Sequence, residues 1–211
     1  MADLEKLSQS VVEGNADAVV RGVKEALAAG VDAERILKQA LVPAMDVVGA
    51  RFETGDMFLP EMLVAALAMK AGVAELKPHL AAAGGASAGS VVIGTVQGDI
   101  HDIGKNLVAM MLAGAGFEVT DLGTDVAPEV FVKTVAETKP QIVGLSALIS
   151  TTVPMITSTI EALSKAGLRA GVKVMIGGAP ITQRFADEIG ADAYSGDAAG
   201  AVTKARQLVE Q

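Results

Sequence analysis

The sequence predicts an α/β protein in which a four-helix bundle precedes a doubly wound, five-stranded parallel sheet of the flavodoxin/Rossmann-like type. Three observations predict this architecture. Apolar residues recur at helical spacing over residues 1–83, a segment of small residues follows, and residues 90–211 then alternate five times between β-rich runs and helical stretches. We therefore expect a helical cap domain at 1–83, a linker at 84–89 and an α/β domain at 90–211.

Four segments of the N-terminal part carry apolar residues at the three- and four-residue spacing of amphipathic helices. They are residues 4–12, 19–27, 36–45 and about 60–83. Asn15 and Asp32 stand where N-caps belong, and Gly30 follows the second segment as a helix stop would. Four helices joined by short turns favour a compact bundle.

The segment GGASAG, Gly84–Gly89, has only small residues that leave the backbone mobile, which is typical of a linker. After it, β-rich runs are expected at 90–96, 117–120, 141–145, 173–176 and 191–194. Helical stretches are expected at 105–115, 127–138, 152–166, 181–189 and 198–209. Ligands of such parallel sheets bind at the carboxyl ends of the strands, so the loops after the first, third and fourth strands are the candidate site.

Composition excludes several classes of function. The 211 residues are 51% apolar and 20% charged, with a formal net charge of -8, so no basic surface is offered to nucleic acid. The longest uncharged stretch, 142–160, is rich in Ser and Thr and includes a proline, so we reject a membrane span. The first ten residues lack a signal-peptide pattern, and with no cysteine there are no disulfides, which together predict a cytoplasmic protein.

Each candidate loop carries a recognisable group of residues. The first holds His101 with Asp99 two residues before it, on the same side of an extended backbone. The second, residues 144–152, is a cluster of hydroxyl side chains, and the third contains Gly177 and Gly178. Taken singly, these loops also fit a capped turn with a solvated histidine, a helix N-cap and a tight turn.

Together the three loops match the cobalamin-binding signature: Asp99-x-His101-x-x-Gly104, then Ser146-x-Leu148, then the glycine pair. The chain therefore resembles the corrinoid proteins of methyltransferase systems and the cobalamin-binding part of methionine synthase. The segment Val48–Met62 is similar to the signature of the helical cap that precedes the cobalamin domain in this family. In that resemblance an apolar side chain, here Phe58, shields the methyl group on cobalt.

The resemblance implies a role for individual residues. His101 becomes the axial ligand of the cobalt, Asp99 fixes its tautomer, and a hydroxyl, here Thr152 where methionine synthase has serine, ends the relay. In this family the nucleotide tail of the cofactor enters a cleft in the domain, and further contacts are expected along that cleft or beneath the corrin ring. They are Asp102, Ile103, Gly104, Ser146, Leu148, Gly177, Gly178, Ala179, Tyr194 and Asp197. Asp102 also fits a helix cap.

The resemblance further implies a function. The chain would carry a methyl group between a substrate:corrinoid methyltransferase and a second methyltransferase that passes it to a folate or a thiol, with a reductive activase as a further partner. No partner is expected among nucleic acids or membranes. The methyl donor stays open among methanol, methylamines, glycine betaine and aryl methyl ethers.

Other functions remain alternatives. The histidine loop also occurs in the cobalamin domain of radical isomerases, which normally lack the helical cap. A cobalamin-dependent sensor or regulator would need a DNA-binding module, and no basic recognition helix is apparent. A metal hydrolase built on Asp99, His101 and Asp102 is weaker, because too few strong ligands converge.

Overall fold

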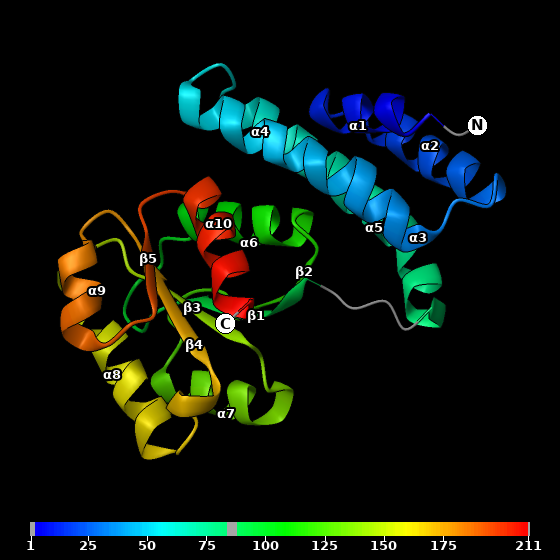
Figure 1. Ribbon diagram of the computed structural model, residues 1–211. Coiled ribbons are helices and arrows are strands. Elements are labelled where there is room, and N and C mark those ends of the chain that lie inside the picture. Colours follow the sequence, from blue (N-terminus) through cyan, green and yellow to red (C-terminus); the bar gives the residue numbers. More distant parts are fainter. Residues whose placement is uncertain (1–2, 84–87, 211) are drawn as a thin grey trace. The chain divides into compact units, whose positions relative to one another are not determined.

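The computed structural model describes residues 3–83 and 88–210, which fall into two compact units (Figure 1). The first unit comprises the helices within residues 1–87 together with 113–116, and the second comprises residues 88–112 and 117–211. Residues 84–87 of the expected linker lie outside the described residues, and its last residue, Gly89, already begins a strand.

The first unit has the expected four helical stretches. They are α1 (Leu4–Val12), α2 (Ala16–Ala28), a third formed by α3 (Ala33–Ile36), η1 (Leu37–Leu41) and α4 (Val42–Thr54), and α5 (Leu59–Ala83). The predicted N-caps are confirmed: the Asn15 carboxamide accepts from the backbone N–H of Ala18, and Asp32 accepts from those of Glu34 and Arg35. The π-helical turn η1 was not predicted, because it leaves the apolar spacing nearly unchanged.

Close packing of α2 against α5 builds the core of the first unit. At Gly72 of α5 an added Cβ would lie 2.7 Å from Val19 Cγ1 and 3.2 Å from Leu41 Cδ1, so only glycine fits without a shift. Buried apolar side chains from all four stretches fill the interior, among them Val11, Val23, Ile36, Leu41, Met62, Met69 and Leu76. The apolar faces of these helices thus point inward, as the amphipathic pattern of the sequence predicts.

The second unit is a five-stranded parallel sheet. Its strands are β1 (Gly89–Thr95), β2 (Phe117–Asp121), β3 (Ile142–Ser146), β4 (Lys173–Gly177) and β5 (Ala193–Ser195). Their spatial order is β2-β1-β3-β4-β5, the flavodoxin-like order, which confirms the predicted fold class. The strand order reverses between β1 and β3, so the ligand crevice of this fold lies outside the carboxyl ends of those two strands.

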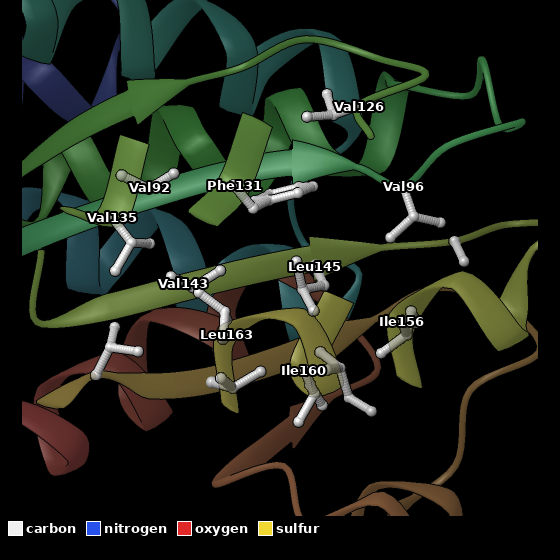
Figure 2. Close-up of a cluster of buried hydrophobic side chains, with 14 of the residues drawn as sticks. Val92, Val96, Val126, Phe131, Val135, Val143, Leu145, Ile156, Ile160 and Leu163 are labelled. Carbon is white, nitrogen blue, oxygen red and sulfur yellow. The ribbon is translucent and has the colours of Figure 1, made fainter. Parts of the chain in front are cut away.

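Helices cover both faces of the sheet (Figure 1). On one face lie α7 (Pro128–Thr138), α8 (Val153–Lys165) and α9 (Gln183–Ile189), and on the other α6 (Ile103–Gly114) and α10 (Ala198–Val209). Figure 2 shows the core of the first face, where Phe131 and Val135 of α7 and Ile156 and Ile160 of α8 meet the sheet. A short 3₁₀ helix, η2 (Arg169–Gly171), precedes β4.

Burial along the strands follows their place in the sheet. All but the last residue of β3 is buried, whereas the edge strand β2 is exposed at three of its five residues. Among the described residues, no helix combines the length and hydropathy needed to cross a bilayer.

Candidate functional site

Two loops meet at the point where the strand order reverses. The loop after β1 runs over residues 96–102, and the loop after β3 runs over residues 147–152. The backbone N–H of Val96 donates to the carbonyl of Ser146 at 3.0 Å, which extends the pairing of the two strands into the loops. Pairing of β1 with β3 therefore brings together residues that lie about fifty positions apart in the chain.

Asp99 is the centre of this site. Its side chain is fully buried, and each carboxylate oxygen serves one loop. Oδ1 accepts from the backbone N–H of His101 at 3.0 Å and lies 2.8 Å from the ring Nδ1 of the same residue. Oδ2 accepts from the backbone N–H of Leu148 at 2.7 Å, from that of Ile149 at 3.3 Å and from the Thr152 hydroxyl at 2.8 Å. The predicted group of Asp99, His101 and Thr152 is thus assembled.

The hydrogen bonds keep Asp99 ionised. Burial of the carboxylate acts to raise its pKa, but hydrogen bonds from the backbone N–H groups of His101 and Leu148, the His101 ring and the Thr152 hydroxyl outweigh burial. The pKa of Asp99 is consequently held well below its ordinary value. An ionised carboxylate only accepts, so the proton of a neutral His101 ring lies on Nδ1.

The His101 ring is presented outward. Its side chain is 48% exposed, and within residues 3–83 and 88–210 no hydrogen bond engages Nε2. The lone pair of Nε2 is therefore available to a ligand such as a metal ion. The hydroxyl of the buried Thr95 donates to the His101 carbonyl at 2.9 Å and holds the backbone beneath the ring.

The Thr152 hydroxyl has two acceptors and one proton. Its oxygen lies 2.8 Å from Asp99 Oδ2 and 2.8 Å from the carbonyl of Ile149, at the last residue before α8. The hydroxyl can therefore remain bonded if Asp99 takes up a proton, by turning its own proton to the Ile149 carbonyl. This geometry is compatible with the relay role expected for Thr152.

Large apolar side chains are exposed around the histidine. Ile100 is 76% exposed and Ile103 75%, while Leu148 and Ile149 of the facing loop are 43% and 39% exposed. An added Cβ at Gly104, the second residue of α6, would meet no atom within 4 Å, so the protein itself leaves that space open. A broad apolar ring system with a central metal fits these residues, because it would cover the exposed side chains and place the metal at Nε2.

The glycine pair at the end of β4, Gly177 and Gly178, packs against the protein's own backbone. Gly178 has φ +133, and an added Cβ would lie 1.9 Å from the carbonyl oxygen of Ala147 in the loop after β3. The backbone N–H of Ala147 in turn donates to the carbonyl of Gly177 at 3.2 Å. The backbone that approaches closely is therefore that of the β3 loop at Gly178 and that of Ser195 in β5 at Gly177.

The remaining expected contacts are spread more widely. Ser146 ends β3, and Ala179 is exposed just after the glycine pair. Tyr194 belongs to β5 and packs against the core, and Asp197 is the N-cap of α10, accepting from the backbone N–H of Gly200 at 2.7 Å. The strand β4 lies between β5, which carries Tyr194, and the β1–β3 pair.

Asp102 and Phe58 occupy different surroundings. The Asp102 carboxylate accepts from the Asn106 carboxamide at 3.0 Å, one turn into α6, instead of capping through a backbone N–H. Phe58 lies in the helical unit, just before α5, and is 70% exposed; its backbone N–H donates to the Glu61 carboxylate. An exposed aromatic side chain of this size is free to cover a ligand or a partner surface.

Sequence reasoning missed the residues that support the histidine loop. They are Thr95 and Asp125, whose carboxylate accepts from the backbone N–H of Gly98. Sequence reasoning also missed the partner of Lys105, a nearly buried cation at the start of α6 that pairs with Asp121 of β2 at 2.6 Å. A lysine inside an apolar helical stretch was a usable signal, because burial of its charge requires a partner. The Asp125 contact depends on how the loop after β2 folds and had no local signal.

Fold and site together define a class of protein: a flavodoxin-like domain that presents one histidine, oriented by a buried carboxylate, to a flat metal-containing cofactor. Two family profiles, both described as B12 binding domain, match residues 89–205 and residues 3–77.

Relatives extend this match over the whole chain. The chain is 45% identical over 207 residues to trimethylamine corrinoid protein 2 and 47% identical over 208 residues to dimethylamine corrinoid protein 1, both of Methanosarcina acetivorans. The first alignment covers 97% of this chain and 95% of the relative, and the second covers 98% and 97%.

Solved structures agree with these relatives. A cobalamin-binding protein from Desulfitobacterium hafniense superposes with a TM-score of 0.81 at 33% identity, covering 99% of both chains. The methanol:cobalamin methyltransferase complex of Methanosarcina barkeri gives a TM-score of 0.83 at 31% identity, covering 98% of this chain and 79% of the other. The chain belongs to the family of B12-binding corrinoid proteins, and its cofactor is a corrinoid.

Proposed function

We propose that this protein is the methyl carrier of a methylamine-type methyltransferase system, with His101 as the axial ligand of its corrinoid. When bound, the cofactor supplies a cobalt centre that accepts a methyl group from one partner and gives it to the next. One observation carries the site assignment: Asp99 fixes the His101 ring with Nε2 outward, amid exposed apolar side chains.

The residues of the site have separate tasks in this proposal. His101 donates the Nε2 lone pair and holds a proton on Nδ1, while the Asp99 carboxylate keeps that tautomer and orientation. If the His101–Asp99 pair took up a proton, the Thr152 hydroxyl would keep a hydrogen bond by turning its own proton from Asp99 to the Ile149 carbonyl. Ile100, Ile103 and Leu148, which are exposed in this structure, would contact the apolar ring system and exclude water from it.

A methylamine as donor is supported by the relatives. The identities of 43% to 47% to trimethylamine and dimethylamine corrinoid proteins extend over nearly the full length of those proteins. The structure of the methanol complex is 31% identical. A substrate methyltransferase specific for a methylated amine is therefore the expected first partner, and a second methyltransferase and a reductive activase complete the proposed system.

Methyl transfer in vitro tests the donor. The reconstituted and reduced protein would be offered separately to trimethylamine, dimethylamine, monomethylamine and methanol methyltransferases, each with its substrate, and methylation would be followed by absorption. We expect methylation with at least one amine enzyme at a rate well above that with the methanol enzyme. Methylation only by the methanol enzyme would overturn the assignment.

The lower ligand is tested by electron paramagnetic resonance on the Co(II) protein. We expect hyperfine coupling to an imidazole nitrogen of the protein in the wild type and loss of that coupling in His101→Ala. The His101→Ala protein should still bind the cofactor, because the nucleotide tail contacts a separate surface. Retention of dimethylbenzimidazole as the ligand in the wild type would refute the role of His101.

A further inference from the structure

The loop that carries the histidine is held by a second carboxylate, which comes from the loop after β2. Asp125 Oδ1 accepts from the backbone N–H of Gly98 at 2.7 Å, and the backbone N–H of Asp125 donates to the carbonyl of Asp99 at 2.9 Å. One residue thus binds both sides of the short segment Gly98–Asp99. The contact is independent of the bonds that the Asp99 side chain makes to the loop after β3.

The backbone of Asp125 is adapted to this double contact. Its φ is +54, in the left-handed region that residues with a side chain rarely adopt, and Gly98 opposite has φ +80. Aspartate tolerates this conformation better than most residues because its short side chain bonds to nearby backbone groups. The parallel bridge between Val96 and Val126 and the bond from the N–H of Val126 to the carbonyl of Thr95 join the two loops directly beside the contact.

The consequence for the histidine is geometric. Asp125 holds the backbone N–H of Gly98, the residue before Asp99, and also the backbone carbonyl of Asp99. It therefore sets the direction in which the Asp99 side chain leaves the backbone. The Asp99 carboxylate in turn sets the orientation of the His101 ring. Asp125 therefore acts on His101 through Asp99, while its own carboxylate faces a backbone amide.

We propose that Asp125 is a positioning residue that holds the histidine loop in its ligand-ready shape before the corrinoid binds. The proposal rests on His101 being the metal ligand. Without the Asp125 carboxylate, the Gly98 N–H loses a charged acceptor and the loop populates other shapes, so only a fraction of molecules can ligate the metal on encounter. Loss of one charge-assisted hydrogen bond predicts about a tenfold weaker apparent affinity for the cofactor.

Two substitutions distinguish the effect of the Asp125 carboxylate from the effect of its backbone conformation. Asp125→Gly keeps a residue that accepts positive φ but removes the acceptor, whereas Asp125→Asn keeps a side-chain oxygen for the Gly98 N–H. Lys139→Gly is the matched control, because Lys139 also has positive φ, at +48, and ends α7. Thermal unfolding of each apoprotein reports whether the fold is intact.

Three measurements test the proposal: amide hydrogen exchange of Gly98 in the apoprotein, cobalamin affinity, and the imidazole coupling of the Co(II) protein. For Asp125→Gly we expect faster exchange at Gly98, the tenfold loss of affinity and a fraction of protein without the coupling. Lys139→Gly should behave like the wild type, and Asp125→Asn, whose neutral oxygen still accepts from the Gly98 N–H, should fall between the wild type and Asp125→Gly. Slow exchange and full coupling in Asp125→Gly would overturn the proposal, as would an Asp125→Asn protein as impaired as Asp125→Gly. A wild type without imidazole coupling would refute His101 ligation itself, while the exchange measurement would still report on the loop.

Discussion

Asp99 shows how one side chain can assemble a site from distant parts of the chain. Its two oxygens receive five hydrogen bonds, from the histidine loop on one side and from the loop after β3 on the other. The sequence predicted the His101 and Thr152 contacts through the resemblance to the family. It could not predict the three backbone donors, those of His101, Leu148 and Ile149, because a backbone N–H has no sequence signal.

The depressed pKa of Asp99 predicts a pH-dependent stability. A group whose pKa is lowered by folding adds stability above its unfolded pKa, about 3.9, and loses it as the pH falls through the lower folded value. Asp99→Asn should therefore lower the free energy of unfolding by about 2 kcal/mol at neutral pH, because backbone donors lose a charged acceptor. Below about pH 4 the difference between Asp99→Asn and the wild type should shrink.

Urea unfolding at neutral and acid pH checks this expectation. Asp32→Asn is the matched control, since Asp32 is an exposed N-cap and asparagine caps as well as aspartate. If the gap between Asp99→Asn and the wild type stayed constant across the acid range, the folded pKa of Asp99 would not be depressed.

At the scale of elements, Gly178 of the glycine pair and Gly104 show that glycine can occupy a position for different reasons. Gly178 is required by the fold, since its φ and the Ala147 carbonyl both exclude a side chain. Gly104 is not required by the fold, since open space surrounds it at the start of α6. The sequence placed both in loops at the sheet edge but could not tell these roles apart, because the approach of the β3 loop to β4 is a tertiary contact.

Alanine at these two positions should therefore have opposite effects. Gly178→Ala should lower the free energy of unfolding by about 3 kcal/mol or more, because strain and a backbone overlap combine. Gly104→Ala should leave apoprotein stability unchanged or raise it by up to about 1 kcal/mol, since alanine favours a helix. The same substitution should weaken cobalamin binding by filling the space that the corrin uses.

Thermal unfolding of the apoproteins and titration with cobalamin separate the two effects. A Gly104→Ala protein with wild-type cobalamin affinity would contradict the placement of the corrin over the start of α6. A Gly178→Ala protein with an unchanged unfolding temperature would contradict the structural role of that glycine.

At the scale of the whole molecule, the alternation of β-rich and helical segments was sufficient to predict all five strands and the order of helices. Strand ends shifted by one or two residues, as at Ser146, which ends β3 one residue later than expected. The π turn and η2 were missed because neither disturbs the apolar pattern that sequence reasoning relies on.

The helical unit leads to a prediction for Phe58. If Phe58 shields the methyl group, as the family resemblance implies, Phe58→Ala should accelerate photolysis of the methylated protein several-fold, because the methyl group loses its cover. Stability should change by less than about 1 kcal/mol, since the side chain is 70% exposed. Leu67→Ala, at an exposed apolar position within α5, is the control. Equal photolysis rates for Phe58→Ala and the wild type would contradict the shielding role.

The long-range bonds of Asp99 also dictate when a newly made chain acquires an oriented histidine. Asp99 binds partners 49 to 53 positions further along the chain, and the loop that supplies them is locked by the still later Gly178. On the ribosome the histidine motif therefore emerges well before the residues that orient it. Ligation of the metal by an oriented His101 therefore has to follow translation of β4, so the bundle and the histidine motif are made while the ring still lacks the bonds that orient it.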